Sequence, residues 1–243
     1  MEEPLIKEFN GIFYPSDKEI SDYRYISFTL PEGYSSIEIE YSFEKEKKCI
    51  IDIGIFDSWK RFRGWSGSSK SRVYIDTTSA TPGYIAGEMP PGTWTVVLGL
   101  ARISDEGCRY RITIKMYKTG SRALSYEKCS YRCNEKTLPT PGSRWVKGDL
   151  HVHSIHSDGK DSVCSLISKA LKLGLDFIAI TDHNTISQLS EIEAVNCQEI
   201  LVIPGVEIST YYGHINTWGR EWFDFRRRSI EDFKSLVKEM RKK

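Results

Sequence analysis

The sequence predicts an α+β protein of two domains, with an antiparallel β-sandwich over residues 1–120 and a run of βα units over residues 147–243. Apolar and polar residues alternate in the first part, which is typical of strands with one buried face. Short apolar runs alternate with helical patterns in the second part, which is typical of parallel sheets. All five histidines of the chain lie in this second part.

Length, charge and hydropathy limit the class of protein. A chain of 243 residues is long enough for two domains, each with its own core. The net charge of +1 gives no reason to expect nucleic acid or a membrane surface as partner. The first residues are acidic and lack the apolar segment of a signal peptide, and no apolar run is long enough to span a bilayer. We therefore expect a cytoplasmic protein.

Four segments of the first part have a period of two, and turn-forming residues separate them. These predicted strands are residues 37–43, 51–55, 94–100 and 110–116. Glycines at 64, 67, 83 and 92 indicate turns, because no helix follows them as it would in a phosphate-binding loop. Trp59, Trp65 and Trp94 could form a sugar-stacking face, although packing in the core or at a domain interface is the favoured interpretation.

Residues 121–146 are predicted to be a linker, because they are rich in turn formers and have no clear period. Cys129 and Cys133 lie in this segment and could form a disulfide. Reduced thiols are the favoured state of all six cysteines, given the expected compartment.

The second part alternates predicted strands with predicted helices. Asp161 or Ser162 can cap the first helix, Gly174 can end it, and Asn184 can cap the second helix. The predicted elements are strands at 146–152, 177–180 and 200–203 and helices at 163–171, 186–195 and 230–237.

Imidazoles and carboxylates gather where these strands end. His151 and His153 are two residues apart on one strand, so both rings can point to the same side and reach one ion. In βα barrels the functional side chains lie at the carboxyl ends of the strands. The pattern therefore predicts a metal site with several ions, and its candidate ligands are His151, His153, Asp158, His183, Glu207 and His214.

Three further features have alternative interpretations. Asp182 could orient the ring of a histidine ligand by a hydrogen bond, or it could be only a turn residue. His156 could face a substrate, although exposure at the surface is at least as well supported. The basic run at 226–228 could attract phosphate, although a solvated start of a helix is favoured.

The segments that carry these ligands resemble the opening motifs of the PHP (polymerase and histidinol phosphatase) domain. The resemblance rests on residues 148–153, 157–159, 181–184 and 205–208, in that order. The first part is similar to the β-domain that precedes PHP domains in carbaryl-hydrolase-like bacterial proteins. That second resemblance rests on residues 63–67, 80–84 and 91–94.

The resemblance implies a (β/α)7 barrel with two or three divalent ions of zinc, manganese or iron. His151 and His153 would hold the first ion. Glu207 would bridge it to a second ion that His214 also holds, and Asp158 and His183 would hold a third. A hydroxide between the ions would attack phosphorus, or the carbonyl of a carbamate or ester. The implied function is that of a metal-dependent hydrolase, most often a phosphoesterase.

The later ligands of the family have no counterpart after His214, since no histidine follows it. We therefore expect that the sequence is a fragment, or that a partner chain completes the barrel, and that this chain alone has little or no hydrolase activity. The alternative function is a non-catalytic protein that binds a glycan or another ligand and keeps a vestigial metal site.

Overall fold

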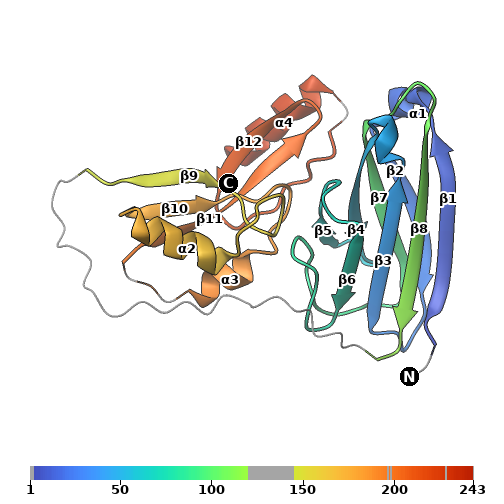
Figure 1. The fold of residues 1–243 in the computed structure, drawn as a ribbon, viewed down its shortest axis with the longest axis horizontal. Coiled ribbons are helices and arrows are strands. Elements are labelled where there is room, and N and C mark those ends of the chain that lie inside the picture. The colour runs from blue at the N-terminus through green and yellow to red at the C-terminus, as the bar shows by residue number, and fades with distance from the viewer. Residues whose placement is uncertain (1–2, 120–144, 196, 198, 228, 243) are drawn as a thin grey trace. The chain divides into compact units, whose positions relative to one another are not determined.

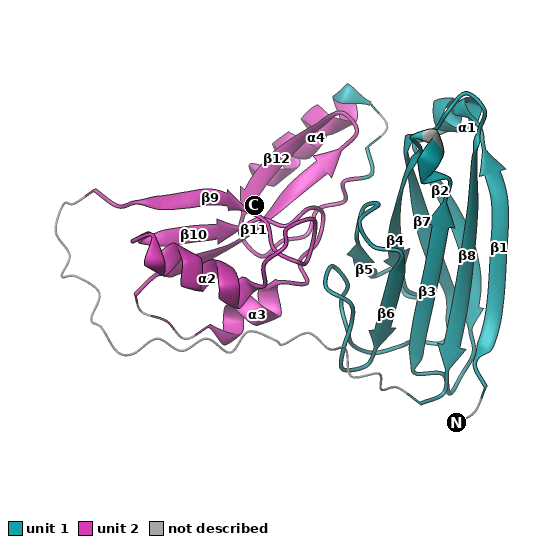
Figure 2. Ribbon diagram, viewed as in Figure 1, with its two compact units in different colours: residues 1–124, 226–230 teal, residues 125–225, 231–243 magenta. Residues whose placement is uncertain are grey.

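The computed structural model describes residues 3–119, 145–195, 197, 199–227 and 229–242. The chain divides into two compact units, one of residues 1–124 and 226–230 and the other of residues 125–225 and 231–243 (Figure 2). Most of the predicted linker, residues 121–144, lies outside the described residues.

The first unit consists mainly of two four-stranded sheets in which every pairing is antiparallel (Figure 1). One sheet has the order β1 (Leu5–Phe13), β8 (Cys108–Tyr117), β3 (Ser36–Phe43) and β6 (Arg72–Asp76). The other has the order β2 (Tyr23–Leu30), β7 (Gly92–Arg102), β4 (Ile50–Phe56) and β5 (Phe62–Trp65). A short helix, α1 (Pro15–Ile20), and a 3-10 turn at Lys45–Lys47 lie in the connections.

One apolar core joins these two sheets. Ile39 of β3 and Ile114 of β8 come from the first sheet, Ile53 of β4 comes from the second, and all three are fully buried in the same cluster. The alternation seen in the sequence therefore marks the faces that the sheets turn toward each other. Trp94 belongs to this core, whereas Trp59 is 55% exposed.

Two residues of this unit depart from the simple pattern. Glu38 is a polar residue in the predicted strand 37–43, and the alternation of that strand predicts that it faces solvent. It is instead buried on β3 and accepts a hydrogen bond from Arg72 Nε at 2.8 Å. The prediction was wrong because an arginine on the neighbouring strand β6 provides the charge that a buried carboxylate requires. Gly64 was predicted to form a turn but lies in β5, where an added Cβ would be 2.4 Å from the carbonyl oxygen of Gly83.

Asp76 closes the turn after β6 and is 1% exposed. Its carboxylate accepts hydrogen bonds from the backbone N–H groups of Thr78 and Ser79, both at 2.6 Å, and from the hydroxyl of Tyr74 at 2.9 Å. Burial opposes ionisation, but these hydrogen bonds outweigh it and lower the pKa of Asp76 below its ordinary value. We expect Asp76→Ala to lower the free energy of unfolding by about 1–3 kcal/mol at pH 7, because buried donors lose their acceptor.

Urea denaturation of the full chain tests this expectation, with Asp105→Ala, at an exposed loop position, as the control. Because the folded pKa of Asp76 is depressed, its stabilising effect is present above the unfolded pKa of about 4 and is lost as the pH falls through the folded pKa. The difference between the wild type and Asp76→Ala should therefore shrink in acid. A difference that does not change with pH would contradict this account.

The second unit contains one four-stranded sheet with the order β12-β11-β10-β9 (Figure 1). The strands β9 (Gly148–Val152), β10 (Phe177–Ile180) and β11 (Leu201–Thr210) are parallel. The strand β12 (Gly213–Trp218) is antiparallel to β11. The sequence did not indicate β12, which is the strand that contains His214. The described residues form an open sheet and not a closed seven-stranded barrel.

Three helices accompany this sheet: α2 (Val163–Lys172), α3 (Leu189–Ala194) and α4 (Ile230–Met240). Ser162 caps α2 by accepting a hydrogen bond from the backbone N–H of Ser165. Ile167 of α2 packs against Ile178 and Ile180 of β10 in one buried cluster. The prediction that Asn184 caps the second helix was wrong, since α3 begins five residues later, at Leu189.

The described cysteines are in two states. Cys49 and Cys108 are free and buried, whereas Cys164 and Cys197 are disulfide-bonded. The expectation of reduced thiols was therefore wrong for Cys164 and Cys197, while Cys129 and Cys133 lie outside the described residues. Among the helices that the structure describes, none combines the length and apolar character needed to cross a bilayer.

Candidate metal centre

The carboxyl ends of the three parallel strands bring the candidate ligands to one edge of the sheet. His151 lies in β9, and His153 follows directly after that strand. His183 comes three residues after β10 and forms a backbone bridge to Glu207 of β11. His214 reaches the same place from β12, where it neighbours Ser209 of β11 in the strand register. The structure thus brings together all six residues that the sequence indicated.

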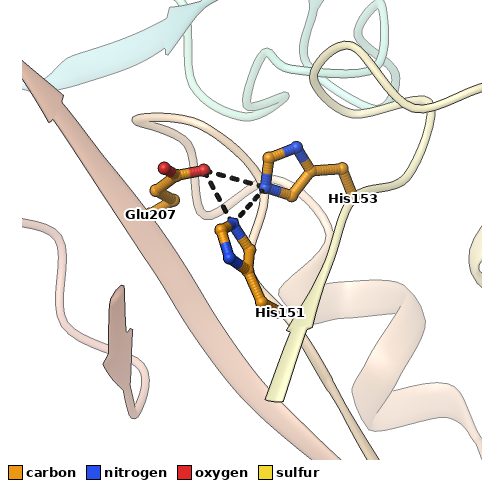
Figure 3. A group of neighbouring side chains, drawn as sticks. All are labelled: His151, His153 and Glu207. Carbon is orange, nitrogen blue, oxygen red and sulfur yellow. Dashed lines mark hydrogen bonds and ion pairs between the residues drawn. The ribbon is translucent and has the colours of Figure 1, made fainter. Parts of the chain in front are cut away.

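The first group consists of His151, His153 and Glu207 (Figure 3). The Nε2 atoms of the two histidines are 3.0 Å apart. Glu207 Oε2 lies 3.0 Å from Nε2 of His151 and 2.9 Å from Nε2 of His153. Two imidazole nitrogens and one carboxylate oxygen therefore point at a common space.

Two further groups share members with the first. In the second group, Asp158 Oδ1 is 2.8 Å from His153 Nδ1, and Asp158 Oδ2 is 3.6 Å from His183 Nε2. In the third group, Glu207 Oε1 is 2.9 Å from His214 Nδ1, and Glu207 Oε2 is 3.2 Å from His183 Nδ1. The ligand atoms within each group lie within 4.8 Å of one another.

The carboxylates of this cluster are held in the ionised form. Burial opposes ionisation of Glu207, but hydrogen bonds from His151 and His214 and the charge of His183 lower its pKa below the ordinary value. Burial likewise opposes ionisation of Asp158, and the hydrogen bond from His153 together with the charge of His183 lowers its pKa. Burial is also the main cause of a lowered pKa at His183, which favours the neutral ring. Ionised carboxylates and neutral imidazoles are the forms that bind metal.

The donor set fits divalent transition metals. Mixed imidazole and carboxylate ligation suits zinc, manganese and iron. Glu207 presents its two oxygens to different groups, since Oε2 faces His151 and His153 whereas Oε1 faces His214. A carboxylate placed in this way can bridge two ions. The geometry is thus compatible with a cluster of ions, and the assignment of each ligand stays a prediction.

Asp182 has a role that neither sequence-based interpretation described. It is fully buried, and its carboxylate accepts hydrogen bonds from the backbone N–H of Ser154 at 2.9 Å and from its hydroxyl at 2.7 Å. It also accepts one from the hydroxyl of Ser157 at 2.6 Å. These contacts bind the loop that leads to Asp158, so Asp182 supports that loop and not the ring of His183.

The prediction that His156 lies at the surface was wrong. The residue is 2% exposed, and its Nδ1 lies 2.7 Å from the hydroxyl oxygen of Ser187 while Nε2 lies 3.0 Å from Glu191 Oε1. These contacts tie the loop after β9 to the start of α3. Gly159 lets the loop fold tightly, because a Cβ there would be 2.3 Å from the carbonyl oxygen of His153. The sequence carried no local signal for His156, since Glu191 is 35 residues away.

Removing the carboxylate of Asp182 should loosen the loop that carries Asp158. We expect Asp182→Ala to weaken zinc binding by about 10–100-fold, which is typical when a group that supports a ligand is lost. Asp182→Asn keeps one acceptor oxygen and should weaken binding less. Zinc titration against a competing chelator measures both variants, and Asp161→Asn is the control because its carboxylate contacts Ser165 and Lys169 on α2. Equal affinity in Asp182→Ala and the control would contradict the supporting role.

Comparison with known proteins gives partial matches in the part of the chain that carries this site. Residues 149–240 match the family model of the PHP domain. The 5'-3' exoribonuclease of Haemophilus influenzae is 45% identical over 65 residues, which are 26% of this chain and 24% of that protein. The DNA polymerase/3'-5' exonuclease PolX of Bacillus subtilis is 33% identical over an alignment of 78 residues, and the match covers 26% of this chain and 14% of that protein.

A third relative is the phosphoribosyl 1,2-cyclic phosphate 1,2-diphosphodiesterase of Eggerthella lenta. It is 34% identical over 64 residues, which are 26% of this chain and 24% of that protein. The matched segments thus span a quarter or less of these curated relatives. Among solved structures, the periplasmic g-type lysozyme inhibitor PliG of Aeromonas hydrophila matches 46% of this chain and 85% of its own, at 11% identity and a TM-score of 0.28. Similarity at this TM-score does not indicate a function.

Proposed function

We propose that the PHP-like part of this chain is a metal-dependent phosphoesterase centre that holds two or three divalent ions. The observation that carries the proposal is the sharing of ligands among three groups at one edge of the sheet. Glu207 belongs to two of these groups, and its two carboxylate oxygens face different histidines. Shared ligands bring ions close together, which is the arrangement that two-metal hydrolases use.

The six residues divide among the ions as follows. His151, His153 and Glu207 would hold the first ion, Glu207 and His214 would hold the second, and Asp158 and His183 would hold the third. When bound, zinc, manganese or iron ions supply water activation and stabilisation of developing negative charge. The chain itself contributes the orientation of its ligands, because Asp182 fixes the loop of Asp158 and the neighbouring strands fix Glu207.

The substrate class in this proposal is a small phosphoester. The names of two relatives describe exonuclease action on nucleic acid, and the name of the third describes cleavage of a cyclic phosphodiester. Phosphodiester chemistry is common to the three. Carbamates and carboxylic esters are the second choice within the same site, since attack on their carbonyl carbon needs the same kind of centre.

Binding of inorganic phosphate to the zinc-loaded chain, measured by calorimetry, tests the proposal even when turnover is slow. We expect phosphate to bind the loaded chain, and not the chelator-treated chain or Glu207→Gln. The second measurement is hydrolysis of bis-p-nitrophenyl phosphate with added manganese or zinc. Any turnover should be lost in the chelator-treated chain and in Glu207→Gln. The proposal would be contradicted if the zinc-loaded chain did not bind phosphate, or if turnover persisted both with the chelator and in Glu207→Gln.

A further inference from the structure

We propose that Ser209 is a positioning residue that fixes the proton of His183 on Nδ1, so that His183 binds metal through Nε2 in the group of Asp158. The inference deepens the proposed function and rests on it. It also resolves an ambiguity in the site, because His183 belongs both to the group with His153 and Asp158 and to the group with Glu207 and His214. A neutral imidazole has one nitrogen with a free lone pair, so it can serve only one of the two.

The surroundings of Nδ1 favour a proton there. The hydroxyl oxygen of Ser209 is 2.5 Å from Nδ1 of His183, and Glu207 Oε2 is 3.2 Å from the same nitrogen. An ionised carboxylate can only accept a hydrogen bond. The Ser209 hydroxyl also lies 3.5 Å from the carbonyl oxygen of Glu207 and 3.4 Å from Nδ1 of His214. It can direct its own hydrogen toward one of these atoms, which leaves its lone pairs for the N–H of the ring. Both neighbours of Nδ1 can therefore accept its proton, and Glu207 can do nothing else.

The surroundings of Nε2 favour an ion. Its neighbour Asp158 Oδ2 is 3.6 Å away, which is too long for a hydrogen bond. Two ligand atoms that bind one tetrahedral ion with bonds of about 2.1 Å lie about 3.4 Å apart. The distance between His183 Nε2 and Asp158 Oδ2 is thus close to that between two ligand atoms of one ion. If Nε2 is the ligand atom, His183 and Asp158 would bind the same ion. His183 would then not be a ligand of the ion between Glu207 and His214.

Hydrogen bonds to the backbone of Ser209 fix its position beside His183. The side chain of Asn184 accepts a hydrogen bond from the Ser209 N–H at 2.8 Å and donates one to the Ser209 carbonyl oxygen at 2.9 Å. Asn184 directly follows His183, and it reaches this geometry with a left-handed φ of 54°. The backbone of His183 and that of Ser209 are therefore clamped together, which sets the distance between the ring and the hydroxyl.

The first test reads the tautomer directly in the zinc-loaded full chain. Long-range proton–nitrogen NMR on histidine-labelled protein distinguishes the two ring nitrogens, and the spectrum of His183→Gln identifies the signals of His183. We expect a protonated Nδ1 and a zinc-bound Nε2. A zinc-bound Nδ1 would overturn the inference, and this measurement does not depend on whether any Ser209 variant folds.

The second test measures zinc affinity by competition with a chelator. Ser209→Ala should weaken one zinc site by about 10–100-fold, whereas Ser209→Thr, which keeps the hydroxyl, should stay close to the wild type. Ser187→Ala is the matched control, because Ser187 contacts the ring of His156, which is outside the three groups. Unchanged affinity in Ser209→Ala would overturn this inference alone. A wild-type chain that binds no zinc would overturn the proposed function as well.

Discussion

Replacing Glu207 by Gln should cause the largest loss of bound metal among single substitutions in this site. Glu207 belongs to two of the three ligand groups, and its two oxygens face different histidines. The amide of Gln has nearly the same size but carries no negative charge. Loss of a group that only supports a ligand costs about 10–100-fold in affinity, so loss of the shared ligand should cost at least about 100-fold. Elemental analysis and zinc competition measure this loss.

The control for this substitution is Glu193→Gln, because Glu193 pairs with Arg220 at the surface and belongs to none of the groups. It should leave the metal content unchanged. Circular dichroism should show that both variants are folded. If Glu207→Gln kept the metal content of the wild type, the bridging role would be wrong even though the six residues lie together.

Replacing His151 and His153 together by Ala should abolish the ion that survives dialysis. Both residues come from the end of β9, and their Nε2 atoms converge on Glu207 Oε2. Each single variant removes one of the two histidine ligands of this group. We therefore expect His151→Ala and His153→Ala each to weaken the retained ion, and the double variant to remove it.

His214→Ala is the comparison for these variants, because His214 belongs to a group without His151 or His153. It should leave the ion at β9 in place. Equal metal content in the wild type and the double variant would show that the retained ion does not bind between His151 and His153.

The sequence predicted the parts of the structure that depend on short-range patterns. The predicted strand ends indicated that His151, His183 and Glu207 lie close together, because parallel strands bring their carboxyl ends to one edge of a sheet. The buried strand of residues 177–180 and the cap at Ser162 follow from apolar runs and from the chemistry of helix starts. These features need no knowledge of distant contacts.

The parts that the sequence did not predict depend on partners far along the chain. Asn184 has the side chain of a helix cap, but its amide is bonded to the backbone of Ser209 on another strand. His156 has no local sign of burial, because Ser187 and Glu191 supply its hydrogen bonds. The strand β12 mixes exposed and half-buried residues, so it has no clear period. Tertiary contacts decided each of these cases.

Elemental analysis of the purified full chain, after loading with zinc and dialysis, tests the central claim most directly. The three ligand groups predict that zinc remains at roughly one ion per chain or more, and that the double substitution of His151 and His153 by Ala removes the most tightly held ion. A folded wild-type chain that retains no transition metal after this treatment would contradict the claim that these histidines and carboxylates form a metal centre.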